Sequence, residues 1–185
     1  MSIEKFKRAK DSRLTLSQLM LPSHSNFSGK IHGGHILNLM DQIAFACASK
    51  HCGNYCVTAS VNKVDFLNPI DVGELISLKA NVNYTGNTSM VIGVRVESEN
   101  IQNGSVKHCN SSYFTMVAKD ANGNNVKVPG LILESVEDVR RYTRSILRFE
   151  QTKMRGDRFN SEEYVVKDHV HLLEGKNAQL LYEEG

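Results

Sequence analysis

The alternation of apolar and polar residues predicts one strand, one buried helix and a run of further strands in the first two thirds of the chain. Residues 13–22, RLTLSQLMLP, read as a strand ending at Pro22, and SHSNFSGKIHGG follows as a loop rich in turn formers. Residues 35–50, HILNLMDQIAFACASK, are apolar on most of the circumference of a helix. Such a helix is expected to be buried.

Four further segments have the composition of strands and are separated by short turns. They cover residues 55–66, 74–85, 89–99 and 106–120, with Gly86-Asn87 and Asn122-Gly123 among the turns. Consecutive strands with short connections predict an antiparallel sheet. The fold class is therefore α+β, a long curved antiparallel sheet wrapped around one central apolar helix. Because one sheet cannot cover that helix on every side, we expect a second subunit to bury the remainder.

The last 52 residues are far more polar than the rest. Charged residues alternate with apolar ones at helical spacing in ESVEDVRRYTRSILRFEQTKMR, which predicts an amphipathic helix. We expect a domain over residues 1–133, a C-terminal helix packed on it over 134–150, and a weakly ordered polar tail over 151–185.

Composition excludes several classes of protein. The chain has 185 residues, 41% hydrophobic, with a net charge of +2, which suits one globular domain and gives no basic surface for nucleic acid. No apolar run is long enough to span a membrane, and MSIEKFKRAK lacks the apolar core of a signal peptide, so we expect a cytoplasmic protein. The four cysteines are then expected to be reduced. Cys47, His51, Cys52 and Cys56 lack the paired spacing of a zinc site, so small buried residues are the better interpretation.

Asp41 is the residue that most needs an explanation. A carboxylate inside the most apolar helix costs several kcal/mol unless it is paired, hydrogen-bonded or solvated. Spacing alone leaves two interpretations: a solvated stripe of Asn38, Asp41, Gln42 and Phe45, or a functional site. The loop before the helix favours the second, although a glycine pair alone is weak evidence. Its Gly33-Gly34 pair leaves N–H groups at Gly34 and His35 near the positive helix end, suited to a carbonyl oxygen or oxyanion.

Several segments together resemble one known family. They are HGGHILNLMDQIAFACASKHC, VTASVNKVDFLNPIDVGELI, YTGNTSMVIGVRVES, SYFTMVAKDANGN and VPGL. The chain resembles the hotdog-fold acyl-CoA thioesterases, and closely their cytosolic acyl-CoA hydrolase branch. The resemblance implies hydrolysis of acyl-CoA to free fatty acid and coenzyme A. It also implies that Asp41 is the catalytic carboxylate and that Asn26 and Thr58 complete the site.

The implied mechanism needs one base and an oxyanion hole, because a thiol with a pKa near ~8.5 can leave as thiolate. Asp41 would activate a water oriented by Asn26 or Thr58, or would attack directly and form a mixed anhydride. The N–H groups of Gly34 or His35 would stabilise the charged oxygen. The side chains of His32 and His35 are expected to pack within the loop.

The resemblance also implies partners. Coenzyme A enters as part of the substrate, and no metal or separate cofactor is expected. Its phosphates need cations or backbone N–H groups, for which the candidates are Lys63, Arg95 and the turn Gly86, Asn87, Thr88 and Ser89. Each of the two cations could instead be a solvated strand residue. We expect a homo-oligomer, a trimer of dimers, with no nucleic acid or membrane partner.

Two other functions on the same fold remain. A non-catalytic acyl-CoA sensor would not be expected to keep a carboxylate at the position of Asp41. A dehydratase or hydratase would need an acid and a histidine placed for proton transfer to carbon, and no such pair is identified in the sequence.

Overall fold

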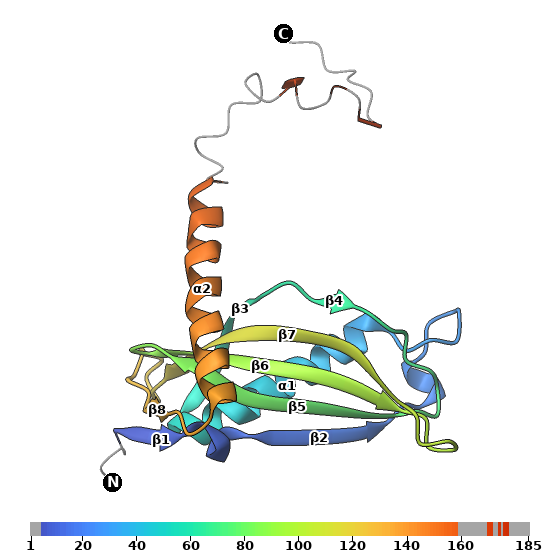
Figure 1. The fold of residues 1–185 in the computed structure, drawn as a ribbon, viewed down its shortest axis with the longest axis horizontal. Coiled ribbons are helices and arrows are strands. Elements are labelled where there is room, and N and C mark those ends of the chain that lie inside the picture. Colours follow the sequence, from blue (N-terminus) through green and yellow to red (C-terminus); the bar gives the residue numbers. More distant parts are fainter. Residues whose placement is uncertain (1–4, 159–169, 172–173, 175, 178–185) are drawn as a thin grey trace. The chain divides into compact units, whose positions relative to one another are not determined.

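The computed structural model describes residues 5–158, 170–171, 174 and 176–177. The chain divides into two compact units, Met1–Ile146 and Leu147–Gly185. The first unit holds a long helix, α1 (Gly33–Cys52), and a six-stranded sheet (Figure 1). The strands of the sheet are β2 (Leu14–Leu19), β3 (Tyr55–Val61), β4 (Asp65–Phe66), β5 (Leu75–Thr85), β6 (Ser89–Glu99) and β7 (Val106–Lys119).

The strand order is β2-β5-β6-β7-β3, with β4 also paired to β7, and every neighbouring pair is antiparallel. Two short strands, β1 (Phe6–Arg8) and β8 (Gly130–Ile132), form a separate parallel pair. The predicted α+β fold, a curved antiparallel sheet around one central helix, is confirmed.

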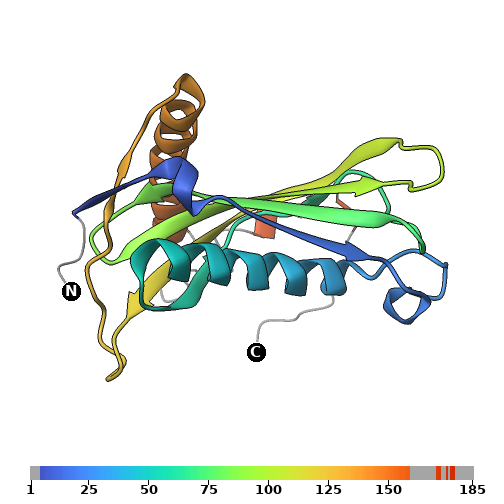
Figure 2. The ribbon, with the colours of Figure 1, turned by 90° about the horizontal axis from the view of Figure 1, so that it is seen from below.

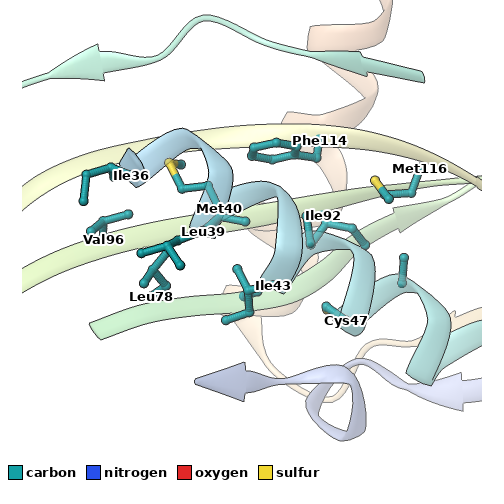
Figure 3. Close-up of a cluster of buried hydrophobic side chains, with 14 of the residues drawn as sticks. Ile36, Leu39, Met40, Ile43, Cys47, Leu78, Ile92, Val96, Phe114 and Met116 are labelled. Atoms are coloured by element: carbon teal, nitrogen blue, oxygen red, sulfur yellow. The ribbon is translucent and has the colours of Figure 1, made fainter. Parts of the chain in front are cut away.

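Burial of α1 against one face of the sheet forms the core. Figure 2 shows α1 lying along that face. Alternate residues of β5 are buried beneath it, because successive side chains of a strand point to opposite faces. The close-up in Figure 3 shows side chains of α1 facing side chains of β5, β6 and β7. The labelled residues are Ile36, Leu39, Met40, Ile43, Cys47, Leu78, Ile92, Val96, Phe114 and Met116.

The sheet covers only one side of α1 in a single chain, as expected for a helix whose remaining face awaits a second subunit. Its outer face is polar or open to solvent at Gly34, Asn38, Gln42 and Phe45, whereas the inner face is fully buried. The helix also begins two residues earlier and ends two residues later than the apolar run. It ends at Cys52 because Gly53 takes a left-handed conformation, φ 73°, that favours glycine.

Two predicted strands have different limits in the structure. The first ends at Leu19, not Pro22, because the chain turns at Met20, whose N–H donates to the carbonyl of Glu74. The segment 55–66 divides into β3 and β4, which both pair with β7. A single strand over this segment was therefore the wrong expectation.

The face of the sheet opposite α1 carries the start of α2 (Val136–Arg158). Arg141 donates to the side chain of Asn81 at 2.9 Å, and the rings of Tyr84 and Tyr142 lie 5.0 Å apart. The helix continues to Arg158, eight residues beyond the predicted end at 150. Most of the predicted weakly ordered tail, residues 159–169, 172–173, 175 and 178–185, lies outside the described residues. In the part of the chain that the structure describes, no helix is long and apolar enough to cross a membrane.

A buried carboxylate joins three strands at one end of the sheet. Glu74 accepts hydrogen bonds from Lys107 at 2.8 Å, from the Ser98 hydroxyl at 2.7 Å and from the Asp71 N–H at 3.0 Å. Burial by itself raises the pKa of Glu74, but these hydrogen bonds and the Lys107 charge outweigh it, so the pKa lies below its ordinary value.

Truncating the centre of the core should destabilise the protein strongly. Leu78 is fully buried between β5 and α1, so Leu78→Ala is expected to lower the free energy of unfolding by about 2–5 kcal/mol. The control is Ile101→Ala, because Ile101 is 57% exposed. Urea unfolding measures both variants, and equal effects would contradict the described core.

Glu74 should make stability depend on pH. Because its pKa is lower in the folded chain, its contribution is present above about pH 4.3, the usual glutamate pKa, and is lost as pH falls further. Glu74→Gln is expected to cost about 1–3 kcal/mol at pH 7 and to flatten this dependence. The matched control is Glu99→Gln, at an exposed position of β6. Denaturant unfolding at pH 7 and pH 3 tests the difference, and parallel pH profiles for wild type and Glu74→Gln would contradict it.

Candidate active site

Asp41 is held by a hydroxyl from the neighbouring strand. It lies at the border of the outer face of α1, half-buried, and the Thr58 hydroxyl donates to its Oδ1 at 2.6 Å. The register of β3 against β7 shifts just after Thr58, between Thr58 and Ser60, and such irregularities redirect a strand's side chains. Asp41 and Thr58, which sequence resemblance assigned to one site, are therefore brought together.

An open hollow of about 380 Å³ lies beside this pair. Its lining combines the carboxylate and hydroxyl with apolar side chains; the residues are Asp41, Gln42, Phe45, Tyr55, Cys56, Val57 and Thr58. The rings of Phe45 and Tyr55 meet edge to face, with centroids 5.5 Å apart, and form an apolar wall. Sequence reasoning missed Gln42 and Tyr55 as lining residues, because nothing in the sequence says that the start of β3 lies beside this part of α1.

The start of α1 offers one free backbone donor of the two expected. The N–H of His35 donates to the carbonyl of His32 at 3.0 Å, so it is not free, contrary to expectation. No acceptor for the N–H of Gly34 occurs among the described residues. A Cβ at Gly33 would lie 3.1 Å from the Phe66 ring, so packing explains that glycine. A Cβ at Gly34 would meet nothing within 4 Å, so packing within the chain does not require that glycine, and the residue is exposed at the start of α1.

The side chains of His32 and His35 make no hydrogen bond to Asp41 among the described residues. His35 stacks on His24, with ring centroids 4.0 Å apart. Burial, followed by the charge of His24, lowers the pKa of His35, which favours the neutral ring at pH 7. His32 lies at the exposed start of α1 without capping it through its side chain. Neither imidazole is hydrogen-bonded to the carboxylate.

Asn26 organises its own loop. Its Oδ1 accepts hydrogen bonds from the Ser28 N–H at 2.9 Å, the Ser28 hydroxyl at 2.7 Å and the Lys30 N–H at 3.1 Å. Within the described residues no hydrogen bond joins Asn26 to Asp41 or Thr58. Since Oδ1 is occupied, the amide nitrogen, a donor, is the part of Asn26 that remains for a ligand.

The residues expected to bind coenzyme A do not form one cluster in this chain. Lys63 pairs with Asp65 at 2.9 Å, and Arg95 donates to Glu97 at 2.6 Å. Arg95 alternates with the buried Val94 and Val96 and so points away from α1 and Asp41. The turn at residues 86–89 lies about 20 Å along β6 from Arg95. Arg95 and this turn cannot hold the same phosphate group.

No group of three potential metal ligands occurs among the described His, Cys, Asp and Glu residues. His51 is buried, and its Nε2 hydrogen-bonds with the carbonyl of Pro129 at 3.0 Å. The four cysteines are free thiols.

Comparison with known proteins identifies the family. The model of the thioesterase superfamily matches residues 28–105. Protein VdlD of Helicobacter pylori is 40% identical over 75% of this chain and 79% of its own. The chain belongs to the thioesterase superfamily.

Other members of the superfamily are similar over much of the chain. The uncharacterized acyl-CoA thioester hydrolase YkhA of Bacillus subtilis is 32% identical over 79% of this chain and 85% of its own. The human cytosolic acyl coenzyme A thioester hydrolase is 33% identical over 77% of this chain but only 38% of its own. The hotdog-fold acyl-CoA thioesterases are thus confirmed as the relevant branch of the superfamily.

Solved thioesterases have the same fold. The crystal structure of an apo-hexameric acyl-CoA thioesterase has a TM-score of 0.80 and 36% identity, covering 82% of this chain and 97% of that one. An acyl-CoA hydrolase from Staphylococcus aureus, in complex with butyryl coenzyme A, coenzyme A and coenzyme A disulfide, has a TM-score of 0.77 and 31% identity, covering 91% and 99%.

The S. aureus hydrolase has also been solved with alanine replacing an asparagine, an aspartate and a threonine. In that chain the asparagine precedes the aspartate by 15 residues and the threonine follows it by 17. Asn26, Asp41 and Thr58 have the same two spacings.

Proposed function

We propose that this chain hydrolyses acyl-CoA thioesters to fatty acid and coenzyme A. The observation that carries the proposal is the Asp41 carboxylate, bonded to Thr58 at 2.6 Å beside an open hollow on α1. The spacing of Asn26, Asp41 and Thr58, shared with the residues replaced in the S. aureus hydrolase, supports the same assignment. Relatives named acyl-CoA thioester hydrolases support the substrate class.

Asp41 is proposed as the base that activates water. Thr58 donates to Oδ1, which fixes the orientation of the carboxylate and leaves Oδ2 to accept a proton from a water. The water oxygen attacks the thioester carbonyl carbon, and the C–S bond then breaks with coenzyme A leaving as thiolate. A leaving thiol with a pKa near ~8.5 needs little help from an acid.

Gly34 is proposed as the donor to the carbonyl oxygen. Gly34 and Asp41 lie seven residues apart on α1, which is about 10 Å along the helix axis. A carboxylate side chain closes only part of that distance, so a water fits between it and a carbonyl held at Gly34. This geometry favours the water mechanism over direct attack by Asp41.

Asn26 is proposed to meet the substrate from a second subunit. Among the described residues its amide nitrogen has no hydrogen-bond partner, and its neighbour Phe27 is fully exposed. The outer face of α1, which carries Asp41, is likewise uncovered in a single chain. Packing a partner there would cover apolar surface and complete the site. Lys63 and the turn at residues 86–89 stay candidates for coenzyme A phosphates, and the cytoplasm is the proposed location.

Asp41→Asn should abolish turnover while leaving the fold intact. Asparagine keeps the shape and can accept the Thr58 hydrogen bond, but it cannot take a proton, so turnover is expected to fall by ~10²–10⁴. Release of free thiol from acyl-CoA, detected with a thiol-reactive dye, measures it. The matched control is Asp11→Asn, at an exposed position outside the hollow.

Thr58 provides a second arm of that test. Thr58→Ser, which keeps the hydroxyl, should retain most turnover, whereas Thr58→Val should not. If Asp41→Asn retains more than about a tenth of the wild-type turnover, the Asp41 carboxylate is not the catalytic base. A change in enoyl absorbance without thiol release would indicate a hydratase instead.

Phe45→Ala should change which acyl chains are accepted. The Phe45 and Tyr55 rings limit the apolar side of the hollow next to Asp41. Removing one ring should raise kcat/KM for longer chains relative to short ones by about tenfold, since each added methylene is worth about 1 kcal/mol. Assays with a series of acyl-CoA lengths measure the profile. If Phe45→Ala and the remote Ile101→Ala have the same profile as wild type, the wall does not limit the chain.

The purified protein should be a homo-oligomer, and a hexamer built from three dimers is the proposed state. Structural relatives named hexameric thioesterases support it. Light scattering at micromolar concentration gives the mass directly. A stable monomer would contradict both the proposed burial of the outer face of α1 by a second subunit and the proposed role of Asn26.

A further inference from the structure

Two thiols that the proposed reaction does not use lie in contact at the C-terminal end of α1. Cys52 is the last residue of α1, and Cys56 is the second residue of β3. Their sulfur atoms are 3.3 Å apart, and both side chains are buried. The turn between them brings them together because Gly53, with φ 73°, reverses the chain directly after the helix.

The surroundings make Cys52 the nucleophile of the pair. The N–H of Asn54 donates to its sulfur at 3.4 Å, which stabilises a thiolate. The hydrogen bond from the Cys56 thiol lowers the pKa of Cys52 to about 7 against the opposing effect of burial, whereas the pKa of Cys56 is raised. A thiol with a pKa near the ambient pH is well matched to attack on a disulfide.

The other two cysteines, Cys47 and Cys109, are poor nucleophiles because their pKa values are raised. The Cys47 thiol donates to the carbonyl of Ser12 at 3.2 Å, and burial raises its pKa to about 12. Burial also raises the pKa of Cys109. Both remain protonated and serve as internal controls.

We propose that Cys52 and Cys56 are a reversible oxidation site that exchanges with low-molecular-weight disulfides. The Cys52 thiolate attacks one sulfur of the small disulfide, forms a mixed disulfide and releases one thiolate. Cys56 then gives up its proton and attacks the Cys52 sulfur, which releases the second thiolate. Two protein thiols are oxidised, and one small disulfide is reduced to two thiols. The turn that must open to admit the reagent includes the exposed Gly53 and Tyr55.

Oxidation would act on the site through β3. A disulfide bond requires about 2.05 Å between the sulfurs, which are 3.3 Å apart here, so oxidation ties the start of β3 to the end of α1 in a new geometry. Thr58 lies two residues after Cys56 on that strand and is hydrogen-bonded to Asp41. This consequence, unlike the cross-link itself, rests on the proposed function. The product of that function is a thiol whose oxidised form, coenzyme A disulfide, belongs to the same reagent class.

The test oxidises the full-length protein with oxidised glutathione in one arm and coenzyme A disulfide in the other. Thiols are counted after denaturation, and the intact mass is measured. Wild type should fall from four free thiols to two, lose the mass of two hydrogen atoms and recover with dithiothreitol. Cys56→Ala should instead retain one half of the reagent, a single glutathione or coenzyme A, in a mixed disulfide with Cys52, and Cys52→Ala should keep its three thiols. Cys109→Ala and Cys47→Ala should each still lose two.

Oxidation of the pair in either arm supports the proposal and identifies its reagent. Wild type that keeps four thiols in both arms overturns it, as does a loss that Cys109→Ala or Cys47→Ala prevents. Turnover of the oxidised protein should fall about tenfold or more, because misplacing a catalytic group by about 1 Å can cost ~10²-fold. Full turnover in the cross-linked protein would overturn the proposed effect of oxidation on the active site through Thr58. The thiol count and mass need no hydrolase activity, so they distinguish failure of this proposal from failure of the proposed function.

Discussion

Burial of one face of α1 against the sheet is the contact on which the rest of the molecule depends. Side chains such as Met40 and Ile43 pack in one core cluster with Leu78 and Ile92 (Figure 3), and close packing of such a core resists rotation of α1. Turning α1 about its axis would expose these side chains and drive Asp41 into an apolar core, at a cost of several kcal/mol. Apolar packing therefore decides the direction in which the carboxylate points.

The position of β3 decides what Asp41 meets. After α1, the chain forms β3 at the edge of the sheet beside β7 and then crosses to the far side to form β5. This arrangement lays β3 along the helix that precedes it, so that Thr58 reaches Asp41 and Tyr55 meets Phe45. An edge strand and an exposed helix face adjoin here, and both are surfaces that a second subunit can cover.

One helix carries three chemically different positions. Its start leaves the Gly34 N–H open, its middle bears Asp41, and its end places Cys52 against Cys56. Because α1 is rigidly packed, a change at its last turn reaches the middle chiefly through β3, which begins beside Cys52 and carries Thr58. The proposed oxidation site and the proposed reaction are thus connected by a single short strand.

Local patterns in the sequence were sufficient for the elements and for part of the site. The alternation in 89–99 predicted β6 to the residue, and the apolar run at 35–50 predicted the central helix, because period and turn residues are properties of neighbouring positions. The partners of those elements were decided only in three dimensions. Nothing local indicates that β3 pairs with β7, or that Tyr55 and Gln42 line the hollow. Resemblance to a family named Asp41 and Thr58, but their hydrogen bond joins residues 17 positions apart and depends on how β3 lies along α1. The sequence by itself determined which residues could form apolar faces and turns and which could react. Tertiary structure decided which of these residues meet, because contact depends on packing across the whole sheet.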